Sequence, residues 1–206
     1  MTSRARIHTK LQRPARAFVR SAFLLLALAG LGAHGHAASD ETTGALRFPQ
    51  VQGRNLEGQA FSLPEGFAGG ANLAIVAFQR WHQDLVDPWI GVAKEIRRDD
   101  ERFRFYELPT IYRGNPLFRL WLDRGMAAGI PDIEARRITI TLYLDKEDFR
   151  RRLAIPDEKT IHLFLLDSDG NVVWRTEGEL TDEGGEELRK AVRALLGPAP
   201  DSGTDD

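Results

Sequence analysis

The side chains best suited to chemistry lie in one short loop that follows an apolar run. Residues 79–87 read QRWHQDLVD and bring together an imidazole, a guanidinium and two carboxyls. His82 could act as a general base, with Asp84 or Asp87 orienting the imidazole. Arg80 could hold an anion. No nucleophile is evident among these residues, so the pattern indicates acid–base chemistry or recognition rather than covalent catalysis.

The same loop also has a purely structural interpretation. Asp87-Pro88 is typical of a helix N-cap followed by a proline at the first helical position. In that case Asp87 is only a cap, Trp81 belongs to the core and His82 is a satisfied surface residue. We predict no catalytic residue and treat the loop as a candidate binding site, with these members: Gln79, Arg80, Trp81, His82, Gln83, Asp87 and Trp89.

A second candidate segment is the small-residue stretch Gly125–Asp132, GMAAGIPD. Small residues let another chain or a ligand approach closely, and we expect this stretch to lie near the first loop. Gly129, Pro131 and Asp132 are therefore added to the candidate binding residues. The alternative is that glycine and proline here only terminate a helix.

The sequence predicts neither a metal site nor a cofactor. After the first 37 residues the histidines that remain are His82 and His162, whereas zinc usually takes three or four protein ligands. The turn 167–170, DSDG, begins like a calcium loop. Its twelfth position is Gly178 instead of an acid, so a plain turn is favoured.

Alternating strand and helix signals must position these residues. We expect a hairpin over Leu46–Leu63, then strands at Asn72–Phe78, Arg102–Glu107, Ile138–Leu144, Ile161–Leu166 and Val172–Arg175. Helices are expected from Asp87-Pro88, from Asn115-Pro116, after Asp145 and after Thr181. This order predicts an α/β fold whose mixed sheet has parallel central strands, an antiparallel C-terminal hairpin and helices on both faces.

Three pieces of this order resemble the thioredoxin-like superfamily, and within it the peroxiredoxin-like branch (alkyl hydroperoxide reductase/thiol-specific antioxidant). They are NLAIVAFQRWHQ, TITLYLDKEDFRRRL and TIHLFLLDSDGNVVWRTEG, and the likeness spans Phe48–Leu196. The resemblance implies a thioredoxin-like fold with its site at the loop after the first central strand. Some cysteine-free members are similar to the mitochondrial assembly factor for ATP synthase, which has the same fold.

The chain departs from the redox members at every position that carries their chemistry. It contains no cysteine. The resemblance would put the two cysteines near Gln83 and Val86, and the facing cis-proline near Ile161. Because only a thiolate performs disulfide exchange, the resemblance implies a scaffold without thiol chemistry.

The ends of the chain predict export. Residues 1–37 carry six basic residues and no acid, with the apolar run Ala22–Ala33 before a small-residue stretch, as in a secretory signal peptide. Cleavage is expected after Ala37 or Ala38, and an uncleaved anchor or a mitochondrial presequence is the alternative. We expect disorder over 38–45, one domain over 46–197 and a disordered acidic tail over 198–206.

Loss of the leader leaves 22 of the 28 basic residues against 30 acidic ones, which argues against nucleic-acid binding. The run Ala22–Ala33 is too short for a transmembrane helix, so none is expected in the mature chain. The sequence therefore predicts a periplasmic or extracellular accessory or complex-assembly factor that binds a protein partner. A membrane complex is one candidate for that partner. The alternatives are a redox or peroxidase relative, or an enzyme that uses His82.

Overall fold

The computed structural model describes residues 46–114, 125–126 and 128–198. The predicted signal segment, the stretch 38–45 and the tail beyond Pro198 lie outside these residues. So does the start of the helix predicted at Asn115-Pro116.

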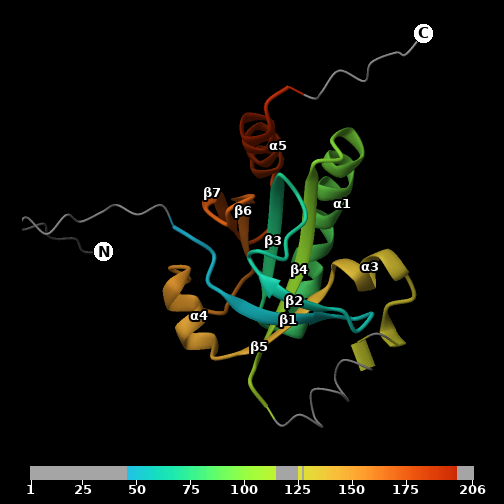
Figure 1. Cartoon of the computed structure of the whole chain (residues 1–206), viewed down its shortest axis with the longest axis vertical. Helices are drawn as coiled ribbons and strands as arrows, with labels where there is room; N and C mark the ends of the chain where they lie inside the picture. The colour runs from blue at the N-terminus through green and yellow to red at the C-terminus, as the bar shows by residue number, and fades with distance from the viewer. Residues whose placement is uncertain (1–45, 115–124, 127, 199–206) are drawn as a thin grey trace, which may run out of the picture. The chain divides into compact units, whose positions relative to one another are not determined.

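Seven strands in the described part of the chain form one mixed sheet, in the order β2-β1-β5-β4-β3-β6-β7 (Figure 1). Their bounds are β1 Val51–Asn55, β2 Ala60–Leu63, β3 Ala71–Ala77, β4 Phe103–Tyr112, β5 Ile140–Leu144, β6 His162–Asp167 and β7 Val172–Glu177. The strands β3, β4 and β5 are parallel, and β1–β2 and β6–β7 add antiparallel pairs at the two edges. The predicted fold class is confirmed.

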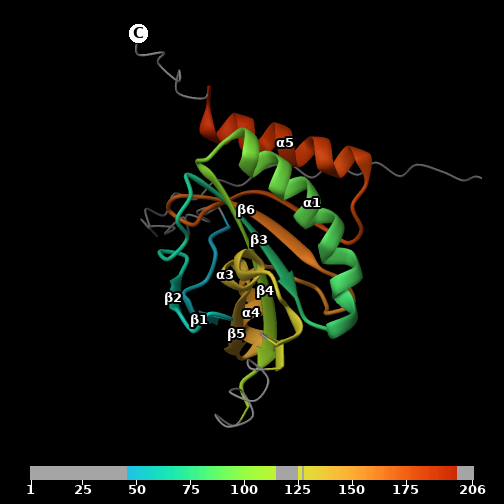
Figure 2. The ribbon, with the colours of Figure 1, turned by 90° about the vertical axis from the view of Figure 1, so that its right-hand side faces the viewer.

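Helices cover both faces of the sheet. They are α1 Gln83–Asp99, α3 Ile133–Ile138, α4 Lys146–Arg152 and α5 Asp182–Leu196, with a 3₁₀ turn, η1, at Arg80–His82. Figure 2 shows α1 and α5 together over one face, and α4 packs against the other through Phe149. All seven residues of β3 are buried, because this strand is paired on both sides, with β4 and β6, and contacts both cores.

The helix caps at Asp145 and Thr181 and the turn at 167–170 form as the sequence predicts. The Asp145 side chain accepts hydrogen bonds from the first N–H groups of α4, and Thr181 accepts from Gly184 N at the start of α5. In the turn between β6 and β7, the Asp167 carboxylate accepts from Asp169 N and Asn171 N. Gly170 has a φ of 83°, which glycine adopts without strain. The cap and turn predictions at these sites are confirmed.

The start of α1 differs from the prediction. The helix begins at Gln83, directly after η1, and Pro88 lies inside it instead of at its first position. Asp87 is therefore not an N-cap. The chain turns earlier because the His82 ring folds back and its Nδ1 accepts a hydrogen bond from Phe78 N at 3.2 Å. Proline is tolerated at position 88 since it removes only one backbone bond, near the N-terminal end.

Candidate functional site

A pocket of about 560 Å³ opens where the parallel strands β3 and β4 end. This edge is where open α/β sheets usually bind ligands. The pocket is lined by residues from β3, the loop after it, η1, α1, β4, the stretches 125–126 and 129–130, and the C-cap of α3: Ala77, Phe78, Gln79, Arg80, Gln83, Glu107, Pro109, Thr110, Ile111, Gly125, Met126, Gly129, Ile130 and Thr139. Most of this surface is apolar, and it lies beside the predicted loop.

Glu107 is the acidic side chain among the described residues of this lining. It is on β4 and only 7% exposed. Burial raises the pKa of the Glu107 carboxyl to about 7, the Thr139 hydroxyl opposes the shift, and the charge of Asp87 adds to it. Near neutral pH this carboxyl is therefore divided between its two protonation states, which is unusual for a glutamate.

The polar contact of Glu107 in the described structure is weak. The Thr139 hydroxyl lies 3.4 Å from Glu107 Oε2, and it also donates to the Ala135 carbonyl at 2.8 Å. Because a hydroxyl has one proton, Thr139 donates it in the shorter hydrogen bond, to the Ala135 carbonyl. Ionised Glu107 is then left without a strong donor, whereas the protonated acid can donate to the Thr139 oxygen. This geometry agrees with the raised pKa.

The rim of the pocket is polar and comes from the predicted loop. Gln79, Arg80 and Gln83 are exposed and line the opening. Gln83 Nε2 donates to Asp87 Oδ1 at 2.7 Å, so Asp87 orients a rim residue from the first turns of α1. Trp81 projects into solvent next to them and is 56% exposed. The structure thus brings five predicted candidates to one edge: Gln79, Arg80, Trp81, Gln83 and Asp87.

His82 lies behind this rim and does not line the pocket. Its side chain is 0% exposed, and its Nδ1 accepts from Phe78 N. Burial lowers the pKa of His82, and the neighbouring His162 lowers it further, while Glu158 opposes the shift. Asp84 and Asp87 are exposed on α1, and Asp87 accepts a hydrogen bond from Gln83 and not from this imidazole. The structure gives His82 a positioning role in the loop.

Trp89 is a core residue of α1. It is 1% exposed, and its indole Nε1 donates to Gly178 O at 3.0 Å. Its ring also meets Trp174 of β7. Trp89 is therefore not one of the described residues that line the pocket, and it supports the site only by packing behind them.

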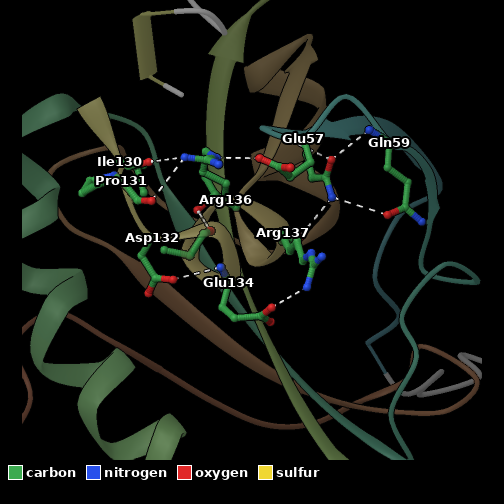
Figure 3. Close-up of polar contacts among 11 residues, drawn as sticks. Glu57, Gln59, Ile130, Pro131, Asp132, Glu134, Arg136 and Arg137 are labelled. Carbon is green, nitrogen blue, oxygen red and sulfur yellow. Dashed lines mark hydrogen bonds and ion pairs between the residues drawn. The ribbon is translucent and has the colours of Figure 1, made fainter. Parts of the chain in front are cut away.

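The opposite wall is held by a cluster of polar contacts around Arg136 (Figure 3). The Arg136 guanidinium donates to the carbonyls of Ile130 at 2.9 Å and Pro131 at 3.4 Å, and it pairs with Glu57 from the β1–β2 turn. Asp132 caps α3 by accepting from Glu134 N at 2.9 Å. Gly129 and Ile130 line the pocket, whereas Pro131 and Asp132 shape the turn that places them.

Sequence reasoning missed Glu107 and Thr139. A signal for Glu107 existed in the alternation RFRFYE, since Glu107 has the same parity as Phe103 and Phe105, which face one core. An acid on the apolar side of a strand is rare and commonly functional. The resemblance would put the two redox cysteines near Gln83 and Val86. In the structure Gln83 lies on the rim of the pocket and Val86 is buried.

The described residues hold no group of three or more side chains placed to bind a metal ion. Among the helices that the structure describes, none combines the length and apolar character needed to cross a bilayer.

The fold is thioredoxin-like. BsSco, a member of the Sco family of cytochrome c oxidase assembly proteins, is similar over 75% of this chain and 96% of its own, with 13% identity and a TM-score of 0.50. A protein of Aquifex aeolicus VF5 named for a proposed role in electron transfer matches 75% of this chain and 99% of its own, at 9% identity and a TM-score of 0.52. A thiol:disulfide interchange protein DsbE of Chlorobium tepidum gives 15% identity over 74% and 97%, with a TM-score of 0.47.

No protein-family model matches the sequence, and no curated protein matches it. At these identities the solved structures define the fold and not the activity. The chain is a thioredoxin-fold protein without cysteine.

Proposed function

We propose that this protein is an exported, non-catalytic accessory or complex-assembly factor that binds a protein partner at the pocket edge. The observation that carries the proposal is the pocket itself, at the carboxyl ends of β3 and β4, with Gln79, Arg80 and Gln83 on its rim. These side chains recognise hydrogen-bonding groups and anions but supply no nucleophile.

The surface beside the pocket has the composition of a protein-binding site. Trp81 is largely exposed next to Arg80, and tryptophan and arginine are enriched among the residues that dominate binding energies at interfaces. The pocket adds an apolar recess into which a partner side chain fits.

Similarity to BsSco supports the assembly role, because its family is described as cytochrome c oxidase assembly proteins. Residues 1–37 support export through their basic, apolar and small-residue order. Membership of the peroxiredoxin-like branch, and the likeness to the ATP synthase assembly factor, stay predictions. So does a membrane complex as the partner.

Affinity capture from cell envelopes tests the proposal. The full chain is expected to retain a specific partner, and the double substitution Arg80→Ala with Trp81→Ala is expected to lose it. Glu187→Gln, an exposed change on α5 outside the pocket, serves as the control. Equal recovery by the double variant and the control would refute docking at this edge.

One observation favours a second candidate function. A carboxyl with a pKa of about 7 in an apolar pocket suits general acid–base catalysis. This candidate replaces His82 by Glu107 as the acid–base group, because His82 is buried outside the pocket lining. A turnover that follows the ionisation of Glu107 and disappears in Glu107→Gln would establish it. Thiol redox activity is not expected, and insulin-reduction and peroxide assays at background would agree.

A further inference from the structure

The chemistry of the pocket floor identifies the group that a ligand must present there. Glu107 is more than nine-tenths buried and lines the pocket. Among the described residues, its carboxylate has one polar neighbour, the Thr139 hydroxyl at 3.4 Å. That hydroxyl donates its proton to Ala135 O instead. A carboxylate has four acceptor sites, so most of its capacity faces the pocket unused.

A cation is the complement that such a carboxylate lacks. A buried carboxylate without a counter-charge is strongly disfavoured, whereas a paired and hydrogen-bonded one is tolerated. The described lining supplies one cationic side chain, Arg80, which belongs to the exposed rim. A ligand that carries a positive charge would supply the counter-charge that the described lining does not place beside Glu107.

The walls set the shape of the rest of the ligand. Between the rim and Glu107 the lining is apolar, with Pro109, Ile111, Met126 and Ile130. An aliphatic stem packs favourably on such walls while its charged end reaches a polar partner.

We propose that the pocket binds a basic group on an aliphatic stem, of the lysine side-chain kind, with Glu107 as its counter-ion. This inference rests on the proposed function, and it assigns the group that the partner inserts. The ammonium supplies three donors to the Glu107 oxygens, and the methylene stem replaces water along the apolar walls.

The charges around Glu107 fit this assignment. Asp87 on α1 acts on Glu107 through its negative charge and attracts a cation at the same place. Arg80 on η1 opposes a cation, but it is exposed, and water and salt screen its charge. The described lining residues from β3, from 125–126 and 129–130, and Thr139 carry no charge.

Peptide titration calorimetry on the full chain tests the inference. The probes are acetyl-Ala-Leu-Lys-Leu-Ala-amide, the same peptide with norleucine in place of lysine, and n-hexylamine. The lysine peptide is expected to bind at least about tenfold more tightly than the norleucine peptide near pH 8, as for a charge-assisted hydrogen bond. Because lysine stays protonated throughout, the preference should shrink as Glu107 is protonated below about pH 6.

Glu107→Gln is expected to remove the preference, and Glu187→Gln to keep it. Binding of n-hexylamine at an affinity equal to that of the lysine peptide also supports the inference and identifies a small amine as sufficient. The inference is overturned if wild type binds both peptides equally near pH 8, or if Glu107→Gln keeps the preference. If Glu107→Gln does not fold, the pH profile of wild type decides: a preference that does not change with pH overturns the inference.

Envelope capture separates this outcome from the proposed function. Partner recovery that survives Glu107→Gln but is lost with Arg80→Ala and Trp81→Ala would leave the docking edge intact and overturn the lysine assignment. Loss of recovery with both variants is expected if both proposals hold. A lysine preference without any envelope partner would keep the pocket chemistry and overturn the docking role.

Discussion

The substitution Glu107→Gln should make the protein more stable than wild type at alkaline pH but not at acid pH. The side chain keeps nearly the same shape and loses only its ability to ionise. In the fold the pKa of Glu107 stands at about 7, against 4.5 for a free carboxyl, because burial disfavours the charged form. Each pH unit between two such values corresponds to about 1.4 kcal/mol, so the ionised side chain disfavours folding by about 3 kcal/mol.

The sign follows from proton binding. Between the two pKa values the folded state holds a proton on Glu107 that the unfolded state has released, so the contribution of Glu107 to the stability of wild type falls as pH rises through this range. The glutamine variant has no such loss. Its free energy of unfolding, minus that of wild type, should therefore increase by about 3 kcal/mol from about pH 4.5 to about pH 8. The constant cost of burying an amide cancels in this difference.

Urea unfolding at a series of pH values, followed by circular dichroism, measures the effect. In thermal unfolding, the melting temperature of the variant minus that of wild type should be about 6–12 °C larger near pH 8 than at acid pH, for a domain of this size. Glu187→Gln removes an equal charge from the exposed surface of α5 and should show no comparable trend. A difference between Glu107→Gln and wild type that stays constant with pH would refute the buried, unpaired state of Glu107.

Three further outcomes are expected. Burial lowers the pKa values of His82 and His162, so the contribution of these two side chains to the free energy of unfolding should fall as pH drops below about 6.5, opposite in sign to that of Glu107. The difference between His82→Asn and wild type in urea titrations should therefore change with pH in this range. Trp89→Phe removes the hydrogen bond to Gly178 O and part of the α1 core, and should reduce stability by about 2 kcal/mol in the same assay. Arg136→Ala should destabilise the protein by about 1 kcal/mol and speed amide exchange over 130–139, while Arg136→Lys retains part of the protection.

The sheet was predictable because its signals are local. The apolar run of β3, the DSDG turn and the Thr181 cap each depend on residues within a few positions of one another. Their order along the chain was enough to predict a mixed sheet covered on both faces.

The candidate site was predictable only in part, because its chemistry depends on distant contacts. The loop that contains Arg80 was found from sequence, but the burial of Glu107 arises where β4 packs between β3 and β5. The start of α1 was misplaced because the His82 ring satisfies Phe78 N, a contact that Asp87-Pro88 does not reveal.

The short helix α3 shows the same limit. It was not expected, and its preceding turn is held through Arg136 by Glu57, 79 positions earlier in the chain. The arginines at 136–137 and 150–152 each have a carboxylate partner in the structure.

The absence of cysteine changes which solution condition can regulate binding at the pocket. With no sulfur able to form a disulfide, thiol–disulfide exchange cannot make or break a covalent bond at the pocket. At this same edge a carboxyl titrates close to neutrality. Where a thiol would make such a site sensitive to redox conditions, Glu107 would make this pocket sensitive to pH. The fraction of pockets that hold a basic ligand would then depend on the pH of the surroundings.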